Sequence, residues 1–253
     1  RFHNATDSIF FTLEDGHVGP AAQGGAQMMF NHAANPLVFR YEEAGKVDTE
    51  LLGSVSTAEW TGWYNLPKLR LGAVLPLHLA SSGREVDGFR LFGDVRFLAT
   101  YAALHSDRLD VATTLDVSVP SGNEKTWLGD KSSVAALSVQ AAWHTEKLLA
   151  LVHAGYRLHL DAVPLGDTDW GNRFSVGLGL AYSLSDALQI TWETTGEFLS
   201  PTHAQAQGGH NAPMETLGGV RYGLMDALEL SVGAGGGITA GVGSPDWRAV
   251  AGL

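Results

Sequence analysis

Cysteine is absent from this chain of 253 residues, and both charged residues and long apolar runs are scarce. Without cysteine the chain forms no disulfide and no thiolate metal site, which fits an oxidising envelope compartment. Charged residues make up 17%, whereas soluble domains usually carry about 25%. No apolar run reaches the roughly 18 residues that a transmembrane helix needs. The net charge of −11 argues against a nucleic-acid partner, which would require a basic surface.

What the chain does contain is a repeated alternation of apolar and polar residues. In the range 148–161 one face carries Leu148, Ala150, Val152, Ala154, Tyr156, Leu158 and Leu160. The range 173–184 repeats the pattern, with Phe174, Val176, Leu178, Leu180, Tyr182 and Leu184 on one face. A period of two over this length predicts β-strands and not helices.

The connections between these strands alternate between short and long. The short turns lie at 65–68, 105–107, 145–147, 185–186 and 225–226. The long polar loops lie at 81–88, 121–131, 161–172, 200–212 and 241–246. This asymmetry is typical of outer-membrane barrels, which have short periplasmic turns and longer outer loops.

The two faces of the strands differ in a way that favours lipid on one side. The polar face carries many Gly, Ala, Ser and Thr residues, which fit the inside of a narrow barrel. The apolar face is rich in Leu, Val, Phe and Tyr, and it would promote aggregation in water. We therefore predict an all-β fold: a closed antiparallel up-and-down transmembrane β-barrel of about twelve strands. The expected strands are 23–41, 45–64, 69–80, 89–104, 108–120, 131–144, 147–161, 171–184, 187–199, 211–224, 227–241 and 245–253.

The barrel is expected to occupy residues 23–253. The chain begins at Arg1 without a signal peptide, and we interpret it as a processed or trimmed segment. An even strand number returns the chain to its starting side, so both termini are predicted to be periplasmic. Residues 1–22 do not follow the barrel pattern and form a periplasmic N-terminal segment in this interpretation. Three forms stay open for it: a short extra strand, a segment inside the lumen, or a disordered lead.

Aromatic residues on the apolar face lie near the short turns. Such amphipathic rings favour the interface between lipid and water. The predicted periplasmic girdle consists of Tyr101, Trp143, Tyr182, Trp192 and Tyr222.

Charged residues on the polar face form the candidate functional site. A buried charge requires a partner, so we expect a network of ion pairs in the lumen. Its predicted members are Asp94, Arg96, Asp110, Asp116, Arg157, Arg173, Glu193, Glu197, Arg221 and Glu229. Two interpretations remain open: paired side chains that stiffen the barrel, or a lining that selects ions in a narrow pore.

We predict no catalytic residues, no metal site and no cofactor. No nucleophile-elbow motif and no nucleotide fingerprint is present. His153 and His159 share the inward face, but six residues of a strand separate them by about 20 Å, too far to chelate one ion together.

Several short glycine-rich motifs carry a family resemblance. They are RYGL at 221–224, LEL at 228–230, GAG at 233–235 and GVGSPDWR at 241–248, with LGAVLPL at 71–77, GDVR at 93–96, VPSG at 119–122 and LGD at 128–130. Over roughly 20–253 the chain resembles the N-terminal barrel of OmpA-family outer-membrane proteins of the myxobacterial type. Barrels described as a MetA-pathway phenol-degradation family are similar too.

The resemblance implies a structural anchor of the Gram-negative cell envelope. In the OmpA family a calcium-repeat linker and a peptidoglycan-binding domain follow the barrel, and we expect any such tether to lie beyond Leu253. The alternatives are a narrow porin-like channel for ions or small solutes, and a barrel subunit of a larger envelope assembly. The expected partners are outer-membrane lipid, lipopolysaccharide, peptidoglycan through that further domain, and other envelope proteins.

Overall fold

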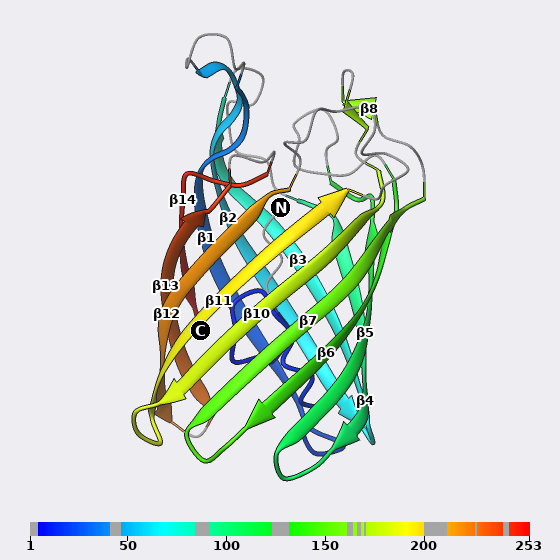
Figure 1. The fold of residues 1–253 in the computed structure, drawn as a ribbon, viewed down its shortest axis with the longest axis vertical. Coiled ribbons are helices and arrows are strands. Elements are labelled where there is room, and N and C mark those ends of the chain that lie inside the picture. The colour runs from blue at the N-terminus through cyan, green and yellow to red at the C-terminus, as the bar shows by residue number, and fades with distance from the viewer. Residues whose placement is uncertain are drawn as a thin grey trace.

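Twelve antiparallel strands form a closed barrel in the computed structural model of the chain (Figure 1). The structure describes residues 5–40, 47–83, 92–122, 132–160, 164–165, 168–169, 171–199, 212–225, 227–239 and 243–253. No helix among them is long and apolar enough to cross a membrane. The barrel strands are β1 (Gly24–Arg40), β2 (Val47–Leu66), β3 (Leu69–Ser82), β4 (Val95–His105), β5 (Leu109–Val119), β6 (Val134–His144), β7 (Leu148–His159), β10 (Arg173–Ser183), β11 (Leu188–Leu199), β12 (Met214–Met225), β13 (Leu228–Gly237) and β14 (Trp247–Gly252).

The predicted fold class, strand number and topology are confirmed. Each strand pairs with its neighbours along the chain, and β1 pairs with β14 to close the wall. Among the described residues, a two-residue pair, β8 (Pro164–Leu165) with β9 (Thr168–Asp169), lies between β7 and β10 outside the barrel order. Most expected strand limits agree with the observed ones to within a few residues. The largest difference is at β4, which starts at Val95 instead of residue 89, and residues 84–91 lie outside the described part of the chain.

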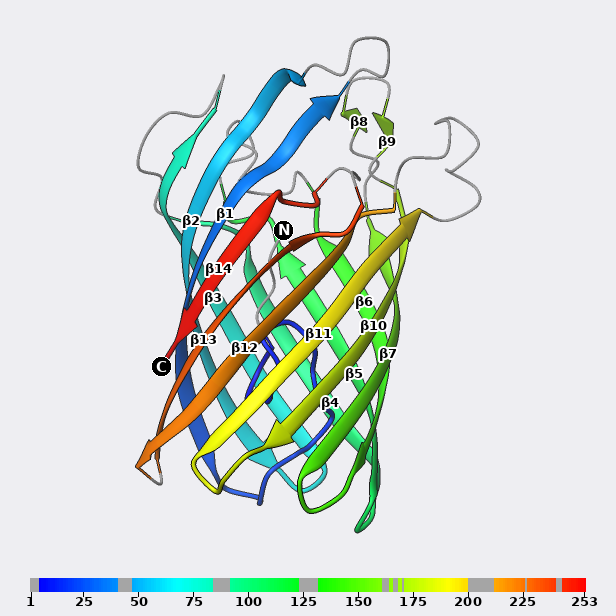
Figure 2. The same ribbon diagram turned by 60° about the vertical axis from the view of Figure 1, so that its left-hand side comes forward.

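The two ends of the barrel differ, as the loop lengths predict. Short turns join the strands at the lower end in Figure 1, which we call the tight-turn end. The other end, the loop end, carries the long connections, whose residues 84–91, 123–131 and 200–211 lie outside the described part. At this end β1 and β2 extend beyond the neighbouring strands as a long hairpin (Figure 2).

Pro76 lies inside β3 although proline lacks the N–H group that a central strand needs. The register pairs Pro76 with Glu59 of β2, whereas the ladder between β3 and β4 ends at Val74. Pro76 therefore lies where β3 has only one strand partner. Its carbonyl oxygen still accepts a hydrogen bond from the Gly93 N–H, at 2.9 Å.

Alternation separates the two surfaces of the barrel wall. Leu178, for example, is 53% exposed on the outside, whereas its neighbour Gly177 faces the lumen. The outside is a broad band of exposed apolar side chains, among them Phe97, Leu115, Leu137, Val152, Leu180 and Val232. The inside carries small, polar and charged residues together with a few apolar ones, such as Met29, Leu151 and Leu217. This arrangement is the reverse of a soluble protein, and it corresponds to a wall that faces lipid on the outside.

Candidate functional site

The N-terminal residues 5–16, which we call the lumenal segment, lie inside the barrel (Figures 1 and 2). The chain then leaves at the tight-turn end and enters β1 at Gly24. Of the three forms left open for residues 1–22, the described residues have the one in which the segment occupies the lumen. The side of the membrane on which it lies stays a prediction.

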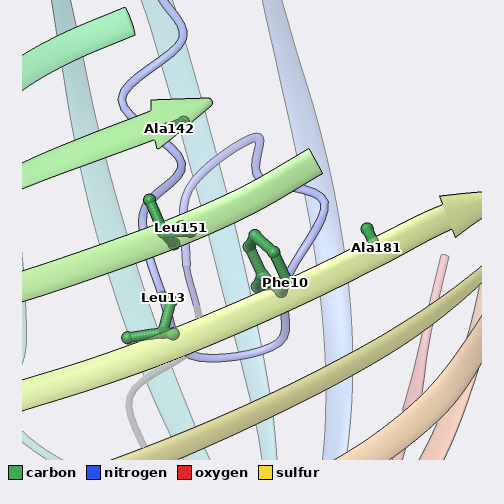
Figure 3. Close-up of a cluster of buried hydrophobic side chains, with 5 residues drawn as sticks. All are labelled: Phe10, Leu13, Ala142, Leu151 and Ala181. Atoms are coloured by element: carbon green, nitrogen blue, oxygen red, sulfur yellow. The ribbon is translucent and has the colours of Figure 1, made fainter. Parts of the chain in front are cut away.

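Three apolar side chains of the lumenal segment form the core of the barrel. Phe10 and Leu13 pack against Ala142, Leu151 and Ala181 of the wall (Figure 3). Phe11 packs on the opposite side, in a cluster completed by Met29, Leu217 and Val250. The three segment side chains are only 2–3% exposed. The hydrophobic core therefore lies between the segment and the inner wall.

Glycines in the wall make room for these large side chains. A Cβ atom at Gly177 would lie 2.5 Å from Leu13 Cδ2, and one at Gly179 would lie 2.7 Å from the Phe10 ring. A Cβ atom at Gly219 would lie 2.6 Å from the Phe11 ring, and one at Gly233 would lie 2.7 Å from it. The small residues of the polar face thus fit this particular segment as well as a narrow lumen in general.

Polar side chains of the wall hold the backbone of the segment. Glu193 accepts hydrogen bonds from the Phe11 N–H (3.1 Å), the Thr12 N–H (3.0 Å) and the Thr12 hydroxyl (2.6 Å). Arg70 donates to the Thr6 carbonyl at 2.6 Å and pairs with the Asp7 carboxylate at 2.9 Å. Arg221 donates to the Ser8 carbonyl. Three wall residues from β3, β11 and β12 therefore satisfy segment groups that would otherwise be buried unpaired.

Bonds within the segment give it a compact looped shape. The Ala5 N–H donates to the Phe11 carbonyl at 2.9 Å, and the Ser8 hydroxyl donates to the Leu13 carbonyl at 2.6 Å. The Thr6 N–H donates to Glu14 Oε1 at 2.7 Å. Burial raises the pKa of Glu14 to about 7, so this carboxyl takes up a proton near neutral pH while the segment is docked.

A cavity lined by charged and apolar side chains lies on the loop side of the lumenal segment, and we call it the polar cavity after its charged residues. Its volume is about 190 Å³, and its floor is formed by residues 12–14. Predicted network residues line its wall: Arg96, Asp116, Arg157, Arg173 and Glu197. Arg96 pairs with Asp116 at 2.6 Å, and Glu197 lies 3.5 Å from both Arg157 and Arg173. These pairs connect strands that lie close together in the wall, so they line the cavity without crossing it.

The other predicted network residues lie in separate contacts. Asp94 accepts hydrogen bonds from the Ser121 and Gly122 N–H groups at the loop end. Arg221 pairs with Glu229 at 2.6 Å, and Glu193 binds the segment as described above. Asp110 lies among histidines at the tight-turn end. The ten residues therefore take part in several local groups of contacts within the described part of the chain.

Sequence reasoning missed several lumenal groups. Arg70 is fully buried, and Arg248 pairs with Glu215 at 2.5 Å and donates to Asn31 at 2.7 Å. The sequence did indicate that these two arginines face the lumen. Arg70 alternates with the outward-facing Leu69 and Leu71, and Arg248 follows the outward-facing Trp247. Residues 5–16 carried no such period, so their partners had no signal.

The five predicted girdle aromatics point outwards and are 42–50% exposed. They are Tyr101, Trp143, Tyr182, Trp192 and Tyr222. All lie in the halves of their strands next to the tight-turn end. Their contact with a lipid interface stays a prediction.

Comparison with known proteins shows shared architecture. The COG4313 outer membrane channel from Pseudomonas putida F1 superposes with a TM-score of 0.75, at 14% identity, over 94% of this chain and 96% of that chain. The NanC porin superposes with a TM-score of 0.61, at 11% identity, over 90% and 98%. No protein-family model and no curated protein matches the sequence. At these identities the likeness shows the fold, and the OmpA resemblance stays a prediction.

The contacts of Glu193 predict that its carboxyl oxygens hold the lumenal segment in place. Glu193→Gln replaces one of the two acceptor oxygens with an amide NH2 group, and a buried polar group left without its partner costs about 1–3 kcal/mol. Because the native chain has no cysteine, Ser8→Cys provides a single buried thiol in the segment. We expect this thiol to react with a maleimide at least about tenfold faster in the Glu193→Gln background, since 1.4 kcal/mol corresponds to a factor of ten.

Glu197→Gln is the matched control, because Glu197 lies on the same strand and pairs with Arg157 and Arg173. Equal labelling rates in the two backgrounds would contradict the role of Glu193.

Proposed function

We propose that this protein is an outer-membrane channel for ions or small solutes, narrowed by its own N-terminal residues. The observation that carries the proposal is a closed barrel with an apolar outside and a polar cavity inside, lined by Arg96, Asp116, Arg157, Arg173 and Glu197. The two solved structures described above are named as a channel and a porin, which supports a channel over a structural anchor. We propose no catalytic role.

The proposed environment follows from the outer surface. Exposed leucine, valine and phenylalanine side chains around the wall suit contact with lipid tails. The aromatics near the tight-turn end suit the periplasmic interface, and lipopolysaccharide would surround the loop end. In this orientation the polar cavity opens towards the outside of the cell, and the lumenal segment lies between it and the periplasm.

The lumenal segment sets the expected conductance. Phe10, Phe11 and Leu13 fill the lumen against the wall, so a solute that leaves the cavity must displace part of the segment or pass beside it. We therefore expect small conductance in the native state, limited by how often residues 5–16 move. The paired charges of the cavity would then determine which ions reach this constriction.

The same filled lumen favours a second candidate function, a structural barrel that does not conduct. Such a barrel would act as an OmpA-type anchor, tethered to peptidoglycan through a further domain, or as a subunit of a larger envelope assembly. Conductance in planar bilayers separates the two functions. A barrel that inserts, is shown to be folded and carries no current would support the anchor.

Gly179→Ala is predicted to open the channel. The added methyl group would lie 2.7 Å from the Phe10 ring, so the ring must move and the segment must shift from its position. We expect a larger mean single-channel conductance than that of the native protein, measured in planar bilayers.

Gly218→Ala is the control for this measurement. The nearest heavy atom to a Cβ at Gly218 is the Thr191 carbonyl oxygen at 3.8 Å, an ordinary contact. Unchanged current in Gly179→Ala, with native-like folding, would argue against the segment as the constriction.

Leu178→Arg is predicted to block membrane assembly. Leu178 lies at the middle of β10 and is 53% exposed on the outside, where a cation at the bilayer midplane costs about 2–4 kcal/mol. We expect little folded protein in the outer-membrane fraction, measured by heat-modifiable electrophoretic mobility. Leu160→Arg is the control, since Leu160 lies beyond the loop end of β7, where the cost falls to about 0–1 kcal/mol. Native levels of folded Leu178→Arg protein would contradict the lipid-facing assignment.

A further inference from the structure

Three histidines and an aspartate meet inside the rim of the tight-turn end. His105 is the last residue of β4, Asp110 is the second residue of β5, and His144 is the last residue of β6. His17 directly follows the lumenal segment, at the point where the chain leaves the lumen. We call these four residues the rim cluster. It lies on the opposite side of the segment from the polar cavity.

The side chains of the rim cluster converge on Asp110. His105 Nδ1 lies 2.6 Å from Asp110 Oδ1. His17 Nδ1 and His144 Nδ1 lie 3.7 and 3.9 Å from Asp110 Oδ2. The rings of His17 and His105 pack edge to face, with centroids 5.9 Å apart. One imidazole comes from the N-terminal chain and two come from the wall, all around one carboxylate.

This donor set fits a transition-metal ion of the zinc type. Zinc binds imidazole nitrogens and carboxylate oxygens at about 2.0–2.2 Å, usually in a tetrahedron. Ligand atoms of His17, His105 and Asp110 already lie within 4.8 Å of one another. The ligand atoms of such a tetrahedron are about 3.3–3.5 Å apart, so these atoms need to approach one another by up to about 1.5 Å.

The exposure of each member permits this contraction. The side chains of His17 and His105 are 53% and 69% exposed, so their rings can rotate and an ion can reach them from solvent. Asp110 is 7% exposed and is held in the wall. The carboxylate is fixed, whereas the imidazole rings around it can rotate. A bound ion can therefore draw the imidazole nitrogens into its coordination shell.

We propose that the rim cluster binds one divalent transition-metal ion, with His17, His105 and Asp110 as ligands and His144 as the fourth. The bound ion joins the end of the lumenal segment, through His17, to β4, β5 and β6. Metal binding therefore stabilises the docked position of residues 5–16. The binding site itself is independent of the channel function proposed above.

Zinc binding by the intact, untagged protein tests the site. The folded barrel is purified in detergent, treated with a chelator, and titrated with zinc chloride by calorimetry. We expect one zinc ion per chain, and an affinity at least about tenfold lower in His17→Gln and in His105→Gln. Both substitutions affect exposed side chains, and heat-modifiable mobility confirms that each variant is folded.

His32→Gln is the matched control, because His32 is bonded to Ser56 on β2, outside the rim cluster. Native affinity in this control is expected. Absence of saturable binding by the native chain, or equal affinity in His17→Gln and the native chain, would overturn the metal site.

A second measurement tests the link to the lumenal segment. In the Ser8→Cys protein, zinc should slow maleimide labelling severalfold. This slowing should disappear in the double variant Ser8→Cys/His17→Gln. The double variant also corrects for any zinc that the thiol itself binds. Zinc binding with an unchanged labelling rate would overturn the stabilising role of the ion. Because neither measurement involves conductance, failure of the channel proposal would leave both results interpretable.

Discussion

Closure of the strand ladder is the constraint on which the rest of this structure depends. In the hydrocarbon core of a membrane no water can satisfy a backbone N–H or C=O group, so each wall strand needs a partner on both sides. The final pairing of β1 with β14, from Met29 with Gly252 to Ala34 with Trp247, removes the last free edge. Once the wall is closed, the two-residue period of every strand sends one set of side chains outwards and the other into a narrow lumen.

The narrow lumen is filled by the chain on one side and holds a cavity on the other. On the tight-turn side, Phe10, Phe11 and Leu13 pack into spaces left by wall glycines and alanines. Glu193, Arg70 and Arg221 bind the backbone of the same segment. On the loop side, paired charges line an open cavity. The segment and the inner wall are thus complementary in both their apolar and their polar groups, and in the proposed channel the position of the segment determines whether the lumen is continuous.

The tight-turn rim connects this segment to the wall a second time. His17 leaves the lumen beside His105, Asp110 and His144, which come from the ends of three strands. Docking within the lumen and the proposed metal binding at the rim therefore act on the same short stretch of chain. In the proposed channel, a ligand bound at the rim would therefore affect the position of Phe10 and Phe11. The inner wall is shaped to fit these two side chains.

The sequence by itself determined the all-β class, the strands and their faces. This was possible because the two-residue alternation shows directly which side chains point outwards. Leu178, Trp143 and Arg96 could be assigned to their faces from the alternation alone. Only the tertiary structure decided which lumenal charges meet, since the stagger of β4 against β5 sets Arg96 beside Asp116. Residues 5–16 have no period, so their position depends on the shape of the finished lumen. The rim cluster likewise joins residues 17 and 144, which become neighbours only when the wall closes around the chain.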